Sequence, residues 1–499
     1  MPGALSAGAA RRVVNPPLGT RQTGFRLFGN PVQAIESDLT ATALVLADER
    51  TKVVVLAIDL SLVGIDLSLR EQRPAQDMRA RIAEALAIPV AHVLLNTSHV
   101  HSGVALPDYM PDTVEQMALK GRYRESLARG LVEAAVEADG RLQPARIGCG
   151  WGDSAVGVYR RETRDGRDVL GEVPDHPIDP SVGVIRVDDL DGNAIAVAFR
   201  YSCHPVTMGP RSAVVSSDFP GVARAVVERT VGGLALFLQG GGGNVNPRAG
   251  MGYEVDCRDT KNRVGLELGG EVVKVAARIR TATRPGRRRP LGNVPNILFT
   301  PWERIEGHAC PHVAAAEATV ALDYVELPSL DEAQGILADR QAMLEERRVG
   351  GAQEWEVRVA EKDEDWARLL VEAAGRREAT CDLHLQAVRV NDIVITGMNA
   401  ELFFETGLEI RARSPLADTF ALGYTNGTIG YLPRADDHPP GGWDVHASYA
   451  VPDLIFQVHP QPVALHPNSE RRAVEATLAL ISRLDCPPPT PRARGLRRR

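Results

Sequence analysis

The chain has 499 residues, of which 44% are hydrophobic and 24% are charged, so it can fold around a substantial core. Its formal net charge of −7 gives no global positive field, and no stretch reaches the roughly 18 apolar residues of a membrane span. These features argue against a nucleic-acid partner and against stable membrane insertion. The first twenty residues lack the apolar stretch of a secretory signal, and the six cysteines form no CxxC pair. We therefore expect a cytoplasmic protein with reduced thiols and a small-molecule partner.

Short apolar runs rich in β-branched residues alternate with helix-like stretches, which predicts an α/β fold. Residues 1–11 are expected to be a flexible N-terminus, and residues 12–480 the folded domain. The predicted strands are, in order, ATALVLA, KVVVLAIDL, HVLLNTSH, VGVIRVDD, AIAVAFRYSCH, GLALFLQG, CDLHLQAVRVND, IVITGMNA and TFALGYTN. The predicted helices cover 71–88, 113–138, 218–231, 259–282 and 401–413. So many strands exceed the needs of one small sheet, and we expect layered mixed β-sheets flanked by helices.

Three further segments differ in composition from the rest. Residues 283–296 combine prolines, glycines and arginines, and predict an exposed connection. Residues 329–377 predict two amphipathic helices, separated by VGGAQ and capped at Ser329, that form an inserted helical hairpin. This hairpin is interpreted as a solvated face with one packed side, or else as a lid or dimer contact. Residues 486–499 are rich in proline and arginine and predict a disordered basic tail.

Two histidines follow a predicted strand in HVLLNTSHVHSGV. His99 and His101 are separated by one residue, which on an extended backbone puts both imidazoles on the same side. Imidazole is a common zinc ligand, and a second histidine can donate to a developing oxyanion. The pattern by itself is equally compatible with a structural pair.

A third histidine, His204, closes the run FRYSCHP. Downstream, Asp218 begins a predicted helix, where it can cap the helix or orient a ligating histidine from behind. The segment GLALFLQGGGGNVNPR places four glycines after a strand, with Asn244 and Asn246 beside them. Because no GKS or GKT follows, we interpret it as a tight active-site turn and not as a phosphate loop.

In this order, NTSHVHSG, CHPVTMGP, SSDFPG, LQGGGGNVNP, GMNAELFFETG and YTNGTIGY resemble the neutral, alkaline (non-lysosomal) ceramidase family, and its shorter bacterial members most closely. The resemblance runs from about residue 12 to about residue 455. It implies one Zn²⁺ ion held by His99, His204, Glu401 and Tyr431, and cleavage of the amide of an N-acyl sphingoid base. Without the resemblance, Glu401 would be a helix N-terminal acid and Tyr431 a core aromatic.

The resemblance also implies two residues that act on the substrate. These are His101 and an arginine that best matches Arg160, with Arg161 one register away. A zinc-bound water would attack the carbonyl, and the zinc, His101 and the arginine would share the developing negative charge. His101 is also the candidate to protonate the leaving amine.

The chain departs from the family at several positions. Ceramidases carry an additional C-terminal β-sandwich, for which the sequence after residue 455 is too short. Trp443 stands where the family has a second tyrosine, and Asn244 replaces an acidic residue of the glycine turn. We assign both residues to substrate binding. The departures leave the zinc site intact and weaken the expectation of a lipid substrate.

Several alternatives stay open from the sequence. The same metal site would serve a hydrolase of an ester, a lactone or a small polar amide, or a binding protein without turnover. A serine hydrolase using Ser98 or Ser102 is disfavoured because the sequence has no GxSxG motif. The stretch HACPH, which contains His308, Cys310 and His312, is interpreted as a loop because Pro311 interrupts helical spacing. A homo-oligomer is also left open.

Overall fold

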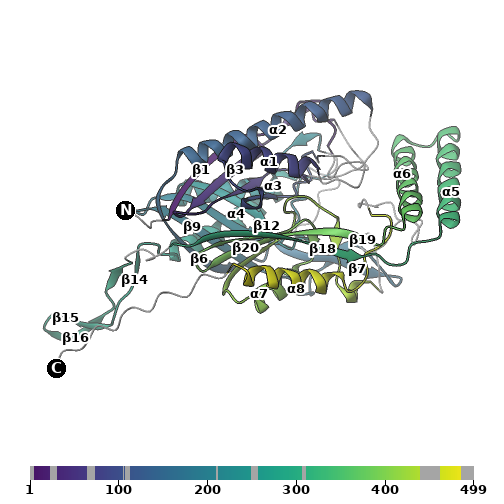
Figure 1. Ribbon diagram of the computed structural model, residues 1–499. Coiled ribbons are helices and arrows are strands. Elements are labelled where there is room, and N and C mark those ends of the chain that lie inside the picture. The colour runs from purple at the N-terminus through teal and green to yellow at the C-terminus, as the bar shows by residue number, and fades with distance from the viewer. Residues whose placement is uncertain are drawn as a thin grey trace.

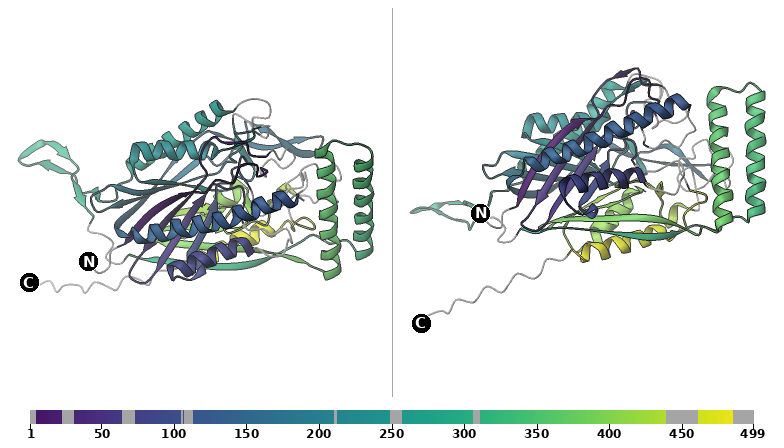
Figure 2. Two further views of the ribbon diagram at one scale, coloured as in Figure 1. Left: turned by 90° about the horizontal axis from the view of Figure 1, so that it is seen from above. Right: turned by 45° about the horizontal axis from the view of Figure 1, so that its top comes forward.

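The computed structural model describes residues 5–22, 31–63, 73–104, 106, 113–209, 212–248, 257–305, 311–438 and 461–484. Its body has four layers, in the order helices, large β-sheet, smaller β-sheet, helices (Figure 1). Two projecting elements leave this body at opposite ends (Figure 2). The predicted α/β class, with layered mixed sheets flanked by helices, is confirmed.

The large sheet has the strand order β12-β10-β9-β6-β1-β3-β4-β5. Its strands are β1 (Ser6–Val13), β3 (Thr40–Ala47), β4 (Lys52–Ile58), β5 (Val93–Thr97), β6 (Gln143–Asp153), β9 (Ser181–Asp189), β10 (Ala194–Tyr201) and β12 (Leu234–Gln239). Among the described residues, strand pairing joins its two halves where the first two residues of β1 pair with the start of β6. They meet again at β12 and β5, where the amide of Gln239 donates to the side chain of Asn96 at 2.8 Å.

The smaller sheet has the order β18-β19-β20-β22, with strands Val313–Asp323, Thr380–Val390, Ile393–Met398 and Asp418–Leu422. Successive side chains of a strand point to opposite faces. Thus Phe420 and Leu422 pack toward the large sheet, while Ala421 packs toward the outer helices. Three short pairings complete the body. They are β11 (Val214–Val215) with β2 (Ala34–Ile35), β13 (Val245–Pro247) with β7 (Gly157–Arg164) and β8 (Arg167–Val173), and β21 (Glu401–Leu402) with β23 (Tyr431–Leu432).

Helices cover both outer faces. The large sheet is covered by α1 (Arg73–Leu86), α2 (Val114–Gly140), α3 (Asp218–Val231) and α4 (Arg258–Arg278), and the smaller sheet by α7 (Phe404–Arg413) and α8 (Ser469–Ser482). Short 3₁₀ turns lie at Val90–His92 and Ala435–Asp437.

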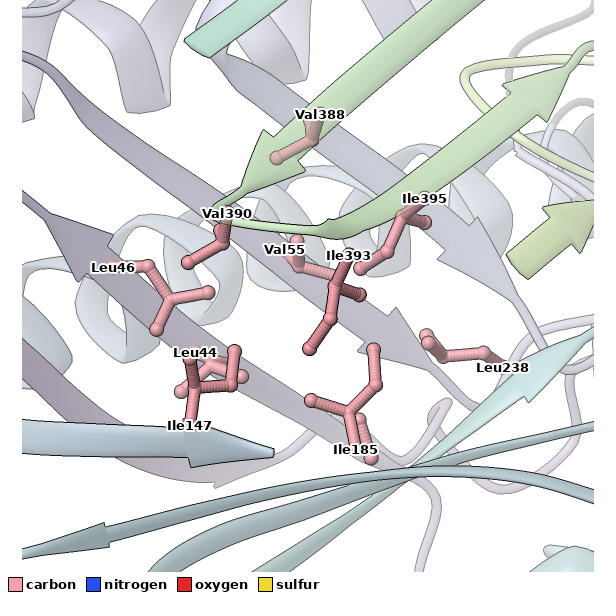
Figure 3. Close-up of a pocket in the computed structure, with 11 residues that line it drawn as sticks. Leu44, Leu46, Val55, Ile147, Ile185, Leu238, Val388, Val390, Ile393 and Ile395 are labelled. Atoms are coloured by element: carbon pink, nitrogen blue, oxygen red, sulfur yellow. The ribbon is translucent and has the colours of Figure 1, made fainter. Parts of the chain in front are cut away.

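Between the two sheets lies a small cavity lined only by aliphatic side chains, among them Leu46, Val390 and Ile395 (Figure 3). Such a lining offers no polar group to hold a substrate, so this cavity is a packing gap of the core.

Two elements project from the body (Figures 1 and 2). The first is the helical hairpin of α5 (Leu330–Val349) and α6 (Glu354–Arg376), predicted at 329–377, with Ser329 as its N-cap. The second comprises two ribbons, β14 (Thr283–Pro285) with β17 (Trp302–Arg304), and β15 (Arg289–Leu291) with β16 (Val294–Phe299). The segment 283–296, predicted to be an exposed connection, is largely exposed. It also contains short strands that were not predicted.

The expected flexible N-terminus is wrong for residues 6–11. These residues belong to β1, which pairs with β3 along its whole length. The segment is held because α2 packs directly on it, and a Cβ atom at Gly8 would collide with the backbone at Ala138. The small residues of this segment let α2 approach its backbone closely, and this packing holds the strand in place although it has few large apolar side chains.

Other expectations concern the cysteines and membrane crossing. Within the described part of the chain, Cys149, Cys203 and Cys381 are free thiols. Cys310, His308, Trp443 and the 486–499 tail lie outside the described residues. Across the described helices, none combines the length and apolar character needed to cross a membrane.

Candidate metal centre

Three buried side chains from distant parts of the chain meet at the centre of the molecule. The Nε2 atoms of His99 and His204 lie 3.4 and 3.5 Å from one carboxylate oxygen of Glu401. His99 follows β5, His204 follows β10, and Glu401 begins β21. Each of the three is at most 3% exposed, so any charge between them would be shielded from water.

Backbone carbonyls fix the orientation of both imidazoles, those of His99 and His204. Nδ1 of His99 lies 2.8 Å from the carbonyl oxygen of Ser61, and Nδ1 of His204 lies 2.5 Å from that of Gly242. A nitrogen beside a carbonyl must carry the proton, which leaves Nε2 as the lone-pair donor directed toward Glu401. Among the described residues, Nε2 of His204 has no hydrogen-bond partner. This is the arrangement in which histidine binds a metal.

The donor separations also fit zinc. Ligand atoms about 2.0–2.2 Å from a tetrahedral zinc lie roughly 3.3–3.6 Å apart, which matches the distances from Glu401 to both histidines. Burial lowers the pKa of His204 well below its usual range, and the Arg160 cation and His99 lower it further. A neutral imidazole is the form that binds a metal.

His101 joins the same cluster. Its Nε2 lies 3.1 Å from Nε2 of His99, and the ligand atoms of His99, His101 and His204 all lie within 4.8 Å of one another. Burial lowers the pKa of His101 well below its usual range, and His99 and His204 act in the same direction. These distances would allow His101 to act either as a further metal ligand or as a proton carrier.

The two histidines of the HxH pair converge by a route that differs from the prediction. The backbone at His99 has φ of 63°, in the left-handed region, and is not extended. Tyr424, whose ring lies 4.5 Å from that of His99, has φ of 51°, so two non-glycine residues at the centre have strained backbones. Such strain persists only where the surrounding structure enforces it, and it is typical of functional sites.

Tyr431 is brought to the centre by strand pairing. It pairs with Glu401 in the short parallel sheet of β21 and β23, and its hydroxyl accepts a 2.7 Å hydrogen bond from Arg160. The Arg160 guanidinium also donates to the carbonyl of Gly243 at 2.6 Å and to Asn246 at 3.2 Å. The position of the Arg160 guanidinium is therefore fixed by three groups from two segments of the chain.

The structure distinguishes Arg160 from Arg161. Arg161 forms ion pairs with Asp168 at 2.9 Å and Asp437 at 3.2 Å, and its guanidinium lies over the ring of Phe403. The register of β7 against β8 shifts between Tyr159 and Arg161, so an irregularity turns the two neighbouring arginines toward different partners. Of the two, only Arg160 faces the centre.

Two predicted residues take other roles. Asn244 is buried, and its amide donates to Glu405 at 2.8 Å and accepts from the backbone of Phe404 at 3.1 Å. Both ends of the amide thus help to hold the start of α7, and the assignment of Asn244 to substrate binding stays a prediction. The carboxylate of Asp218 accepts from Thr207 and from the amide of Met208, so it anchors the loop after His204 and does not orient the imidazole.

The glycine turn permits a close approach of its backbone to another segment of the protein. A Cβ atom at Gly243 would lie 2.7 Å from the carbonyl oxygen of Leu402, and one at Gly241 would lie 2.6 Å from that of Phe403. The turn therefore packs flush against the segment that carries Glu401. The hydroxyl of Ser102 donates to the carbonyl of Ser216, which gives no support to a serine nucleophile.

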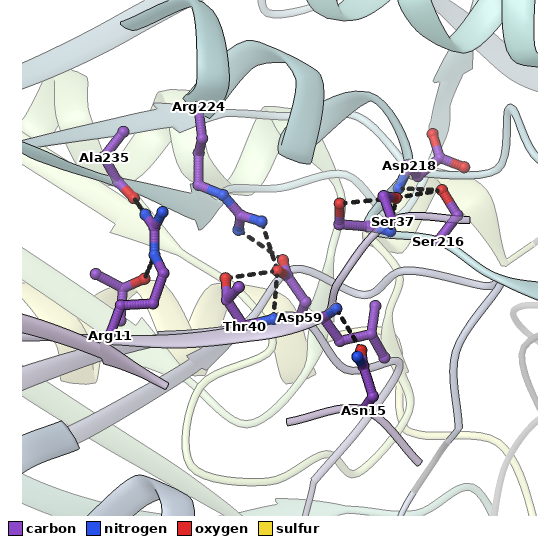
Figure 4. Close-up of polar contacts among 12 residues, drawn as sticks. Arg11, Asn15, Ser37, Thr40, Asp59, Ser216, Asp218, Arg224 and Ala235 are labelled. Atoms are coloured by element: carbon purple, nitrogen blue, oxygen red, sulfur yellow. Dashed lines mark hydrogen bonds and ion pairs between the residues drawn. The ribbon is translucent and has the colours of Figure 1, made fainter. Parts of the chain in front are cut away.

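Sequence reasoning missed a buried ion pair behind His99. Arg224 of α3 donates to both carboxylate oxygens of Asp59 at 2.7 and 2.5 Å, and Asp59 also accepts from the amide and hydroxyl of Thr40 (Figure 4). Asp59 begins the loop whose carbonyls at Leu60 and Ser61 bind the amide and Nδ1 of His99. The only signal in the sequence was a carboxylate at the end of the run KVVVLAIDL.

Tyr424 was also missed. Its ring lies 4.5 Å from that of His99, and its hydroxyl donates to Glu401 at 3.4 Å. Burial raises the pKa of Tyr424, and Glu401 raises it further, so the hydroxyl stays protonated as a donor. Tyr424 lies within the predicted strand TFALGYTN, but nothing in that run indicated a role at the metal site.

Comparisons with known proteins show similarity to ceramidases in sequence and in fold. No protein-family model matches the chain. Neutral ceramidase A of Dictyostelium discoideum is 24% identical over 264 residues, and neutral ceramidase B of the same organism is 23% identical over 253 residues. These alignments cover 50% and 46% of this chain, but only 36% and 34% of the relatives, so the matched part is about a third of their length.

Two solved structures share the fold over nearly the whole chain. A ceramidase complexed with C2 gives a TM-score of 0.65 at 14% identity and covers 97% of this chain and 75% of its own. The neutral ceramidase of Pseudomonas aeruginosa gives 0.64 at 15% identity, covering 98% and 76%. The predicted resemblance is thus confirmed, and the chain is a relative of the neutral ceramidase family.

Proposed function

We propose that the chain is a zinc-dependent hydrolase that cleaves the amide bond of an N-acyl substrate. The observation that carries this proposal is the convergence of His99, His204 and Glu401, with both imidazoles fixed through Nδ1 by backbone carbonyls. These three residues would hold the ion, and Tyr431 would be the fourth ligand. When bound, zinc supplies Lewis acidity, which lowers the pKa of water and polarises a carbonyl.

The chain's own residues would supply the remaining chemistry. His101 has a lowered pKa and lies beside His99, so it is neutral and can take up a proton and pass it to the leaving amine. Arg160 cannot lose its proton and is held rigidly, so it would stabilise negative charge on the carbonyl oxygen. Its bond to Tyr431 would keep it in place before the substrate binds.

The substrate class follows from the relatives. Their names point to ceramide, a linear N-acyl amine, and an amide of this kind is the substrate we propose for this chain. We further propose that the protein acts in the cytoplasm, in keeping with its free thiols.

Metal analysis joined to a substrate panel tests the proposal. Purified protein should contain one zinc ion per chain, and it should hydrolyse a short-chain ceramide faster than a matched ester or an N-acyl amino acid. His99→Ala and His204→Ala should each lose both the zinc and the activity. If these variants keep their zinc, the ligand assignment is wrong. If zinc is bound but the ester or the polar amide is preferred, the metal centre stands and the substrate assignment is wrong.

A further inference from the structure

The ribbons of residues 283–304, here called the arm, expose an unusual number of large apolar side chains. Five of them are between 45% and 53% exposed, namely Leu291, Val294, Ile297, Leu298 and Trp302. The arm extends away from the body in every view (Figures 1 and 2). Within the described part of the chain, the strands of the arm mainly contact each other, β14 with β17 and β15 with β16, and make few contacts with the helices and strands of the body.

The arm is also poorly stabilised by itself. It consists of two-stranded ribbons, and within the described part of the chain no third strand pairs with either one. An isolated two-stranded ribbon is at best marginally stable in water, and its unpaired edges are ready to pair with another chain. Such an element needs a partner surface to cover it.

The charge of the arm identifies this partner. The arm contains one acidic residue, Glu303, and five arginines. All five arginines are exposed, at 284, 287, 288, 289 and 304. The arm therefore carries +4, and subtracting this from the formal −7 leaves −11 on the rest of the chain. Two arms would repel each other, whereas an arm and the body of another copy attract. Arginine is well suited to such contacts because its fork binds carboxylates in pairs.

The distribution of the apolar groups favours a protein partner over a membrane. Ile297 and Leu298 are neighbours in β16, so they point to opposite faces of the ribbon, and both are about half exposed. A peripheral membrane anchor presents one apolar face and one charged face. A ribbon that is apolar on both faces fits a groove or a strand edge of another protein. We propose that the arm docks on the acidic body of a second copy of this chain and forms a dimer.

The mass of the full chain in solution tests this proposal. At micromolar concentration, light scattering should give twice 53.9 kDa, and the dimer should weaken as salt screens the arginines. Ile297→Thr with Leu298→Thr keeps β-propensity and removes apolar surface, so it should raise the dissociation constant at least tenfold. Arg287→Glu with Arg288→Glu and Arg289→Glu should do the same by reversing the charge. A matched control is Val349→Thr, at a residue that is 78% exposed at the end of α5, and it should leave the dimer intact.

Crosslinking tells which surface the arm meets. A photoreactive residue at position 298 should give a dimer-sized product whose linked peptide comes from the body, and one at position 349 should not. The proposal is overturned by a wild-type chain that stays monomeric at high concentration, by variants that dimerise as wild type does, or by crosslinks between two arms. A monomer that binds vesicles containing anionic lipid would also overturn it and assign the arm to a membrane surface.

Discussion

The metal centre and the arm depart from ordinary burial in opposite directions. At the centre, charged groups such as Asp59 and Arg224 are buried, and each is paired within the chain. On the arm, apolar groups such as Leu291 and Leu298 are about half exposed. A buried charge requires a fixed partner, and an exposed apolar surface gains from an external one. The comparison therefore separates a rigid region, where we propose a metal site, from an exposed region that we propose binds a second copy of the chain.

The largest expected effect is at the ion pair behind His99. Arg224→Met leaves the carboxylate of Asp59 buried without its counterion, which should lower the free energy of unfolding by about 3–5 kcal/mol in urea denaturation. Arg229→Met, at an exposed position of the same helix, is the control and should change it by no more than about 0.5 kcal/mol. Equal effects of the two variants would contradict the contrast between buried and exposed charge.

The same pair should influence the metal through the loop that it holds. Because Leu60 and Ser61 bind His99, the folded Arg224→Met protein should bind zinc about 10–100-fold more weakly, as is usual when an outer partner of a ligand is lost. Competition with a chelator measures this affinity. Substituting both partners, with Asp59→Leu added, should restore stability but not zinc affinity.

The next effect concerns catalysis at Arg160. Arg160→Ala should lower kcat about 10²–10³-fold, or about 2.7–4 kcal/mol, while zinc stays bound, because a fixed donor to the developing oxyanion is lost. The matched variant is Arg161→Ala, which breaks ion pairs with Asp168 and Asp437. It should lower stability and leave kcat of the folded protein near that of wild type. If the two variants exchange these effects, the assignment of the neighbouring arginines is reversed.

The fold could be predicted where periodicity was strong. Helix α3 begins and ends at the predicted residues because Asp218 starts it and Gly232 stops it. Strand β1 was missed because its first residues, SAGAA, are small, and small residues indicate close packing only once α2 is known to lie on them. Strand β18 was also missed, because its many alanines give no clear alternation of apolar and polar residues, although they pack against the outer helices.

The centre could be predicted only in part. His99 and His204 each close an apolar run, which is a signal in the sequence itself. Glu401 and Tyr431 meet through strands of two residues each, too short for any periodic pattern, so they depended on the family resemblance. Arg160 and Arg161 could not be separated because a shift of strand register decides which one faces inward.

A smaller effect is expected from acid at a second buried ion pair. Burial raises the pKa of Asp179, but Arg200, 2.6 Å away, and Ser181 outweigh it, so the pKa is lowered. A lowered pKa adds stability above the pKa of the unfolded chain, and this stability is lost as the pH falls through the folded value. Asp179→Asn should therefore cost about 1.5–3 kcal/mol at neutral pH and progressively less in acid. A cost that is constant with pH would contradict the ionised pair.

The smallest effect tests whether the helical hairpin is independent of the centre. Ser329 caps α5 through Glu332 in a reciprocal capping box, and its loss should cost about 1 kcal/mol. The hairpin meets the body through a few side chains, including Trp366, which donates to the carbonyl of Pro462. Ser329→Ala should therefore speed hydrogen exchange in the first turn of α5 and leave zinc affinity unchanged.

The control for this prediction is a cap within the body. Thr113 caps α2 by accepting from the amide of Gln116, and α2 packs against the large sheet over its length. Thr113→Ala should cost a similar amount, but the loss should appear as lower global stability, because α2 can open only together with the core. If Ser329→Ala lowers global stability as much, the hairpin unfolds with the body. In that case the hairpin and the body would form one cooperative unit, and only the arm would be separate from it.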